Sequence, residues 1–219
     1  MENGRRAYGE LAADAPDAGG RDLFALSGGR REAVSKPALL LHSCCGPCCT
    51  AVTERLAAAY RITVFFYNPN IHGQGEYERR RAAQLAFIDR YNRRADPEDR
   101  IAFMEGAYEP EVFEGLAKGL EGEPEGGERC RACIGLRLER TAETAILMGF
   151  EAFTTTLSVS PHKSHALISR IGGELGARCR VHFIAEDFKK RAGWQRSVQL
   201  SAEYGLYRQK SCGCRFSAE

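Results

Sequence analysis

Short apolar runs alternate with longer segments of helical periodicity along most of this chain, and this alternation limits the folds open to it. Five runs have the length of buried strands, at residues 38–41, 62–67, 101–104, 152–159 and 181–185. Strands that alternate with helices form parallel sheets covered by helices on both faces. The sequence therefore predicts a doubly wound α/β domain with five parallel strands in the order 3-2-1-4-5.

The segments between those runs are predicted helices, at about residues 48–60, 76–94, 109–120, 129–148, 162–177 and 194–204. Ser160-Pro161 is expected to open the fifth of them, because proline suits the first position of a helix. Residues 1–35 are rich in Gly, Ala, Asp and Arg and carry few large apolar side chains. We expect them to form a flexible tail, so that residues 36–219 make up a single domain.

The charge and hydropathy of the chain argue against membrane-spanning and secreted proteins. The formal net charge is +2, which does not by itself indicate a nucleic-acid partner. No run approaches the eighteen or more apolar residues that a membrane span needs, and the N-terminus has no apolar segment typical of secretion. We therefore expect a cytoplasmic protein without a membrane anchor, in a compartment where structural disulfides are rare.

Nine cysteines lie mostly in clusters, which in a reducing compartment indicates metal ligation or redox chemistry. The largest cluster, Cys44, Cys45, Cys48 and Cys49, follows the first predicted strand and lies at the start of a helix. Ligands bind at the carboxyl ends of strands in this architecture, and a helix N-terminus stabilises thiolates. The cluster is therefore a candidate metal or redox site, with a simple disulfide or an inert buried turn as alternatives.

Cys130 and Cys133 begin another predicted helix, where residues three positions apart share one face. Together with Cys44 and Cys45 they would supply four thiolates, the usual complement of a [4Fe–4S] cluster. Zinc accepts the same four ligands. The spacing alone does not separate the two metals.

Cys212 and Cys214 are separated by a single glycine near the C-terminus. A disulfide between them would close a small, strained and easily reduced ring, which suits a catalytic or electron-relay pair. The alternatives are two further metal ligands or a frayed tail. Cys179 stands alone and is interpreted as a small buried hydrophobic residue.

Two basic runs are candidate contacts for the phosphates of a nucleic acid. The first lies on the predicted 76–94 helix and includes Arg79, Arg80 and Arg81, and the second comprises the basic residues of 189–196. Charge runs of this kind are more often solvated faces. His42 and His162 lie near predicted strand ends and are candidates for proton transfer.

Several motifs, in the right order over about residues 38–217, resemble the QueH-type epoxyqueuosine reductases. They are HSCCGPC at 42–48, YNPNIH at 67–72, EY at 76–77, CRAC at 130–133, FTTTL at 153–157 and YRQKSCGCRFS at 207–217. The resemblance implies reduction of epoxyqueuosine at the tRNA wobble position, the final step of queuosine biosynthesis. It also implies a fold similar to nucleotide-hydrolase-like domains. This chain lacks their Ser-Gly-Gly-x-Asp-Ser loop, so we expect no use of ATP.

The resemblance further assigns roles to particular residues. It implies a [4Fe–4S] cluster on the positions Cys44, Cys45, Cys130 and Cys133, and a redox-active pair at Cys212 and Cys214 that an external electron donor would reduce. With tRNA as the partner, the arginines of the first basic run become phosphate contacts. A wobble base must leave its stack to reach a buried site, and we expect Tyr67 and Tyr207 to stack on it.

Two cysteines depart from the family pattern. Cys49 stands where a small polar residue is more usual and is interpreted as a bystander, whereas Cys48 is a candidate ligand for a second metal such as an additional iron. Two other functions compete with the reductase. One is a zinc-stabilised RNA-binding module, and the other is an iron–sulfur redox protein resembling heterodisulfide reductases, although the earlier spaced cysteine of those modules is absent here.

Overall fold

The computed structural model describes residues 36–217, and the expected flexible tail at residues 1–35 lies outside them. Five parallel strands form one sheet in the order β3-β2-β1-β4-β5, so the predicted fold class and strand order are confirmed. The strands are β1 (Ala38–His42), β2 (Arg61–Phe66), β3 (Ala102–Glu105), β4 (Ala152–Thr155) and β5 (His182–Phe183). β1 is central and pairs with β2 and β4 on its two sides.

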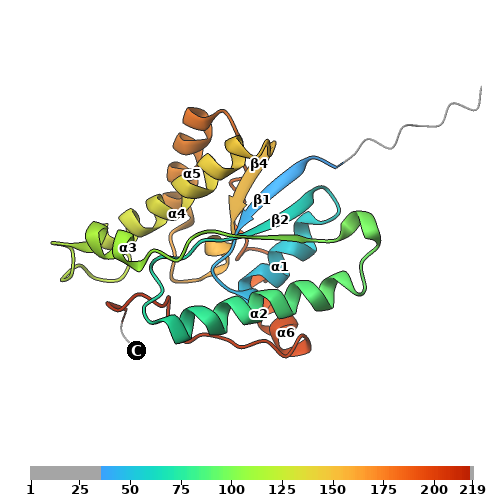
Figure 1. The fold of residues 1–219 in the computed structure, drawn as a ribbon, viewed down its shortest axis with the longest axis horizontal. Helices are drawn as coiled ribbons and strands as arrows, with labels where there is room; N and C mark the ends of the chain where they lie inside the picture. Colours follow the sequence, from blue (N-terminus) through green and yellow to red (C-terminus); the bar gives the residue numbers. More distant parts are fainter. Residues whose placement is uncertain (1–35, 218–219) are drawn as a thin grey trace, which may run out of the picture. The chain divides into compact units, whose positions relative to one another are not determined.

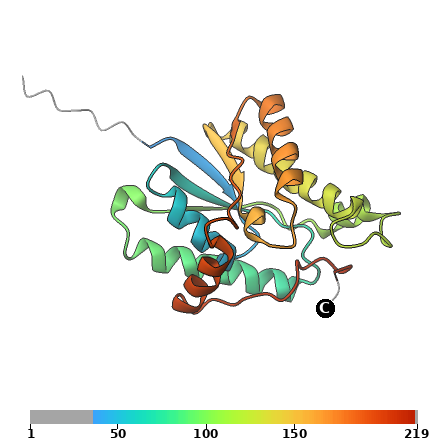
Figure 2. The same ribbon diagram turned by 180° about the vertical axis from the view of Figure 1, so that it is seen from behind.

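Helices cover both faces of the sheet (Figures 1 and 2). The helices are α1 (Gly46–Leu56), α2 (Gln74–Asn92), α3 (Pro110–Ala117), α4 (Glu128–Leu147), α5 (His165–Cys179) and α6 (Gly193–Glu203), with short 3-10 turns η1 (Pro97–Asp99) and η2 (Thr156–Val159). In the part of the chain that the structure describes, no helix combines the length and the apolar character that crossing a bilayer would require.

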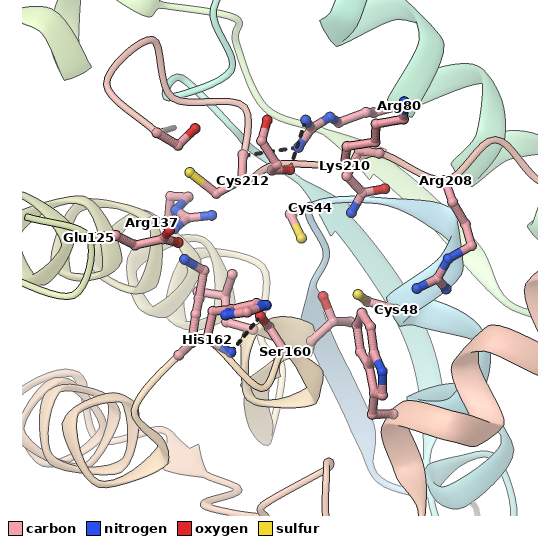
Figure 3. Close-up of a pocket in the computed structure, with 17 residues that line it drawn as sticks. Cys44, Cys48, Arg80, Glu125, Arg137, Ser160, His162, Arg208, Lys210 and Cys212 are labelled. Atoms are coloured by element: carbon pink, nitrogen blue, oxygen red, sulfur yellow. Dashed lines mark hydrogen bonds between the residues drawn. The ribbon is translucent and has the colours of Figure 1, made fainter. Parts of the chain in front are cut away.

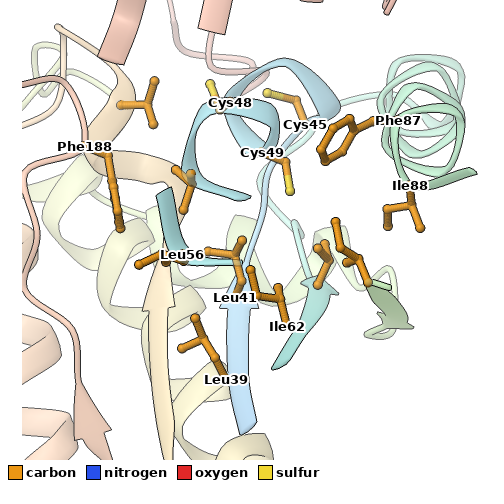
Figure 4. Packing of buried hydrophobic residues seen from close by; sticks show 14 of the residues in the cluster. Leu39, Leu41, Cys45, Cys48, Cys49, Leu56, Ile62, Phe87, Ile88 and Phe188 are labelled. Carbon is orange, nitrogen blue, oxygen red and sulfur yellow. The ribbon is translucent and has the colours of Figure 1, made fainter. Parts of the chain in front are cut away.

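The alternation of side chains along β1 explains the two layers, since successive residues of a strand face opposite sides of the sheet. Leu39 and Leu41 pack with residues of α1 and α2, including Leu56 and Phe87 (Figure 4). Leu40 packs on the other face with residues of α4 and α5. All three leucines are fully buried. β1 is therefore covered on both faces, as its uninterrupted apolar sequence indicates.

Several element boundaries differ from the sequence predictions, and at two of them a side chain caps the backbone. β4 ends at Thr155 instead of continuing to residue 159, since the Thr155 hydroxyl accepts a hydrogen bond from the Leu157 N–H and starts the turn η2. α5 begins at His165 instead of residue 162, since Ser164 accepts a hydrogen bond from the Leu167 N–H. Pro161 therefore lies in the turn before the helix.

The sheet changes winding direction between β1 and β4. The chain leaves β1 into α1, which packs on one face, and leaves β4 through η2 into α5, which packs on the other. The carboxyl ends of two neighbouring strands whose connections diverge form the usual ligand-binding position of such sheets. The first cysteine cluster follows β1 at this position.

Candidate active site

A cavity of about 460 Å³ lies at the carboxyl ends of β1 and β4. Its wall includes Cys44 and Cys48 after β1, Thr156 of η2, residues of the loop between η2 and α5, and residues 208–212 of the C-terminal segment. Figure 3 shows Cys44 and Cys212 on the same wall region, with Ser160 and His162 on the side of the η2–α5 loop. The cavity thus joins the first and the last cysteine clusters of the sequence.

The thiols after β1 gather at the start of α1. The sulfurs of Cys44 and Cys45 lie 3.9 Å apart, and α1 begins at the next residue, Gly46. A β-carbon at Gly46 would lie 2.6 Å from the carbonyl oxygen of Ala83, so only glycine lets α1 start this close to α2. The N-terminus of a helix favours ionisation of the thiols beside it.

The four thiols of this cluster are not equivalent. Hydrogen bonds from Cys45 and Cys48 hold the pKa of Cys44 well below its usual range, with Arg137 adding to the effect. The same interactions raise the pKa of Cys45 and of Cys48. Cys44 is therefore the first thiol of the cluster to ionise. Burial raises the pKa of Cys49 to about 11, which keeps it a neutral core thiol.

His42, the last residue of β1, is fully buried and joins β1 to its neighbours. Its Nε2 lies 3.1 Å from the Tyr67 carbonyl oxygen, so Nε2 carries the proton, and its Nδ1 lies 2.8 Å from the Thr155 hydroxyl. The Thr155 hydroxyl donates to Nδ1 and accepts from the Leu157 N–H. Burial and the charge of Arg137 lower the pKa of His42 to about 4. His42, a candidate for proton transfer from the sequence, is therefore a neutral side chain that hydrogen-bonds to Tyr67 and Thr155.

A second group of thiols surrounds a smaller adjacent cavity, whose wall includes Cys130, Cys133, Cys212 and Cys214. Arg137 lies on the walls of both cavities, and its side chain is buried with Nε donating to the Cys133 carbonyl at 3.2 Å. Its charge lowers the pKa of both Cys44 and Cys133, although burial dominates and raises the pKa of Cys133. One buried guanidinium therefore stabilises thiolates in both groups.

The C-terminal segment is fixed to the domain by Arg80 of α2, which is 2% exposed. Its guanidinium donates to the carbonyl oxygens of Cys212 at 3.0 Å and Ser211 at 3.3 Å, and its Nε donates to Glu76 at 2.6 Å. Gly213 has a φ of +91°, and a β-carbon there would lie 2.9 Å from the guanidinium of Arg80. The buried guanidinium of Arg80 therefore fixes the turn that carries the Cys212 and Cys214 thiols.

Further hydrogen bonds place the same segment over the first cysteine cluster. The His72 N–H donates to the Gly213 carbonyl at 2.7 Å, and the Gln209 amide donates to the Cys45 sulfur at 2.8 Å. A hydrogen bond from Cys214, the charge of Lys163 and a hydrogen bond from Ser217 lower the pKa of Cys212 against the effect of burial. The bond from Cys214 in turn raises the pKa of Cys214. The pair therefore contains one favoured thiolate and one favoured thiol.

The two tyrosines expected to stack on the substrate base lie away from the cavity or within the protein. The Tyr67 ring is 1% exposed and stacks on Phe65, with the Arg140 guanidinium 5.3 Å from its centroid. Tyr207 is 41% exposed, but its hydroxyl donates to Glu76 and Arg79 lies over its ring. Neither tyrosine is part of the cavity wall that the described residues form.

The arginines of the first basic run have partners inside the chain. Arg79 and Arg80 both pair with Glu76, and Arg81 pairs with Glu105 at 2.7 Å. Of the three, Arg80 alone reaches the cavity wall formed by residues 36–217. Its bonds to backbone carbonyls give it a role in positioning the C-terminal segment.

Residues 36–217 contain no ready-made cage of three or more His, Cys, Asp or Glu side chains that would hold a metal ion. Cys44 and the pair Cys130 and Cys133 lie on the walls of adjacent cavities and not of a single one. The donor set nonetheless suits an iron–sulfur group by its chemistry, since both sets of thiols are soft ligands beside the buried charge of Arg137.

Sequence reasoning assigned no individual role to several polar residues of the cavity wall, among them Thr156 and Lys163. Thr156 was expected inside a strand, where nothing distinguishes it from its neighbours. Lys163 is a single lysine in a turn. Arg137 has a signal in the sequence, since its position four residues after Cys133 on one helix places both side chains on the same face.

The fold and the site together define a doubly wound α/β protein with a thiol-rich site at the switch between β1 and β4, a chemistry suited to electron transfer. Residues 39–219 match the family model described as epoxyqueuosine reductase QueH. Proteins of that name are similar to this chain in several bacteria. The one from Streptococcus pyogenes serotype M1 is 40% identical over 184 residues, which cover 84% of this chain and 71% of the relative.

A relative with the same name from Thermotoga maritima is 37% identical over 185 residues, which cover 82% of this chain and 89% of the relative. The one from Haemophilus influenzae is 36% identical over 181 residues, which cover 82% of this chain and 71% of the relative. The chain belongs to the QueH family of epoxyqueuosine reductases. The family expected from the motifs is thus confirmed, and these enzymes are oxidoreductases.

Proposed function

We propose that this chain reduces epoxyqueuosine in tRNA to queuosine, the final step of queuosine biosynthesis, in the cytoplasm. The observation that carries the proposal is the placement of Cys44 and Cys212 on the wall of one cavity. They come from opposite ends of the domain, and each has a pKa lowered toward thiolate by its neighbours. Two such groups beside a ligand-sized cavity suit reductive chemistry better than simple binding.

A [4Fe–4S] cluster held by Cys44, Cys45, Cys130 and Cys133 would supply electron transfer in one-electron steps. Buried thiols, the N-terminus of α1 and the cation Arg137 all favour the thiolate forms that ligation requires. Cys48 remains the candidate for a second iron, because its sulfur interacts with those of Cys44 and Cys45 and it lies on the cavity wall.

Cys212 and Cys214 would supply a two-electron couple. Removing the epoxide oxygen as water breaks two carbon–oxygen bonds, forms a carbon–carbon double bond, and consumes two electrons and two protons. Oxidation of the Cys212 thiolate and the Cys214 thiol to a disulfide releases the two electrons and one of the protons, and solvent supplies the second proton. An external electron donor then reduces the disulfide and restores the starting state. The lowered pKa of Cys212 supports its role as the thiolate of the pair.

The function is tested by incubating anaerobically purified protein and a reductant with epoxyqueuosine-tRNA. The nucleosides of the digested tRNA are then analysed by mass. We expect conversion to a nucleoside lighter by one oxygen atom. Protein that contains iron and binds the tRNA, yet leaves the epoxide intact, would contradict the proposal.

Serine variants of Cys212 and Cys214 separate the redox pair from the metal ligands. We expect each variant to retain full iron and the visible spectrum of the cluster but to lose turnover. Cys44→Ser is the matched comparison, because it should lose iron. Iron lost from Cys212→Ser or Cys214→Ser would make that residue a ligand, as their shared cavity with Cys130 and Cys133 would then explain. Colourless protein with stoichiometric zinc would contradict the cluster itself.

A further inference from the structure

Several arginines of the two basic runs form ion pairs with carboxylates of the same chain. On α2 and at its end, Arg79 pairs with Glu76 and Arg93 pairs with Asp89. In the second run, Arg196 pairs with Glu54. An ion pair has no net charge and exerts little long-range attraction on phosphates, since exposed pairs are also screened by salt.

The cavity wall, by contrast, carries more cationic than anionic side chains. Its charged residues are five cations, a histidine and a single carboxylate: Arg80, Arg137, Lys163, Arg208, Lys210, His162 and Glu125. Arg80 and Arg137 donate hydrogen bonds to backbone carbonyls. Arg208 donates to the Ser201 hydroxyl and lies over the Trp194 ring. These cations outnumber Glu125 and the thiolate-favouring Cys44 and Cys212, so the wall has an excess of positive charge, which concentrates anionic ligands.

Lys163 and Lys210 are the two cations of this wall whose side chains donate no hydrogen bond to another described residue. Among the described residues, neither ammonium has a carboxylate within the 4.0 Å of a salt bridge. Lys163 belongs to the η2–α5 loop, beside His162, and Lys210 belongs to the C-terminal segment, two residues before Cys212. Both lysines line the cavity, and they reach it from different segments of the chain.

A polar atom inside the cavity also lacks a partner. The Thr156 side chain is fully buried and lies on the cavity wall, and its hydroxyl has no hydrogen-bond partner among the described residues. Burying an unpaired hydroxyl is unfavourable, so this hydroxyl is available to hydrogen-bond a molecule that enters the cavity. A cavity of about 460 Å³ has the size of a small-molecule site, so it admits a single nucleotide and not a duplex.

We infer that Lys163 and Lys210 are the phosphate contacts of the substrate RNA, and that they line a cavity which receives one everted nucleotide. The identity of that RNA rests on the proposed function. The inference moves phosphate recognition from the arginine-rich face of α2 to the cavity wall beside Cys44 and Cys212. Because both lysines line the cavity that the Cys44 and Cys212 thiols also line, binding of the RNA backbone to the lysines would set the position of the base relative to the thiols.

The test measures binding of an anticodon stem–loop RNA with an ordinary guanosine at the wobble position, by fluorescence anisotropy over a range of salt concentrations. Because this RNA undergoes no reaction, binding is scored independently of turnover. We expect Lys163→Gln and Lys210→Gln each to weaken binding several-fold and to reduce the slope of log Kd against log salt by about 0.7 to 0.9. The matched controls, Arg93→Gln and Arg196→Gln, should leave the slope unchanged. Melting curves establish that every variant is folded.

The inference is overturned if the lysine variants bind with the wild-type slope, or if the control variants lower the slope and the lysine variants do not. Either result can occur while the protein still reduces epoxyqueuosine-tRNA, which separates failure of this inference from failure of the proposed function. Conversely, a reduced slope in the lysine variants of a protein without reductase activity would support an RNA site at the cavity and contradict the proposed reaction alone.

Discussion

Arg79 and Arg80 are neighbours in the sequence, but their side chains lie in opposite surroundings. The Arg79 side chain is 62% exposed and the Arg80 side chain is 2% exposed, although both pair with Glu76. The sequence shows only a basic run, because nothing local indicates that one guanidinium reaches carbonyls more than a hundred residues away. Tertiary contacts alone determine which of these arginines is buried and which is exposed.

Replacing Arg80 by methionine should therefore lower the free energy of unfolding by about 3 kcal/mol, because loss of the buried guanidinium leaves two carbonyls unpaired and removes one of the three hydrogen-bonding partners of Glu76. The same change at Arg79 should alter the stability by less than about 0.5 kcal/mol. Urea denaturation of the two variants measures the difference. Equal effects at both positions would contradict the positioning role of Arg80.

Cys49 offers a second test at the scale of a residue. It is fully buried, its pKa is raised to about 11, and it packs from α1 into the core (Figure 4). Cys49→Ala should cost about 1 kcal/mol of stability through lost packing. The variant should retain its iron and its turnover. Iron content and activity check this expectation, and loss of iron would make Cys49 a ligand instead of the bystander we infer.

Among the elements, the strands could be predicted from the sequence more reliably than the ends of the helices. The run Leu39–Leu41 is apolar throughout because both faces of β1 are covered, and this signal is local. By contrast, the end of β4 and the start of α5 depend on hydrogen bonds of Thr155 and Ser164, which compete with strand and helix propensity. The cysteines were located by motif, whereas the grouping of Cys130 and Cys133 with the C-terminal pair required the structure.

The attachment of the C-terminal segment to α2 should depend on pH through Glu76. Burial acts to raise the pKa of Glu76, but hydrogen bonds from Arg79, Arg80 and Tyr207 outweigh it and lower the pKa. A carboxyl whose folded-state pKa is depressed contributes stability above its unfolded pKa of about 4.5. That stability is lost as the pH falls through the lower folded-state value.

The measurement is the free energy of unfolding of the wild type and of Glu76→Gln between neutral pH and about pH 3. The variant should be less stable at neutral pH by about 1 to 3 kcal/mol, because charge-assisted hydrogen bonds are lost. The difference between the two proteins should then shrink as the pH falls below 4.5. A difference that stays constant over this range would show that ionisation of Glu76 does not stabilise the attachment.

At the scale of the whole molecule, the sheet and the C-terminal segment cooperate to form one site. Diverging connections after β1 and β4 open the position that the first cysteine cluster occupies. The segment beyond α6 then returns across α2, where Arg80 and the backbone of His72 hold the Cys212 turn at the cavity. Cys44 and Cys212 therefore line one cavity although about 170 residues separate them in sequence.

The measurement that tests this account most directly is a single turnover without an external donor. Protein is reduced anaerobically, freed of reductant and mixed with excess epoxyqueuosine-tRNA, and the queuosine formed is compared with the loss of free thiols. The account predicts that each queuosine formed consumes two thiols, that Cys212 and Cys214 become a disulfide, and that serine variants at either position form none. Queuosine formed with no change in thiol content, or undiminished in those variants, would contradict it.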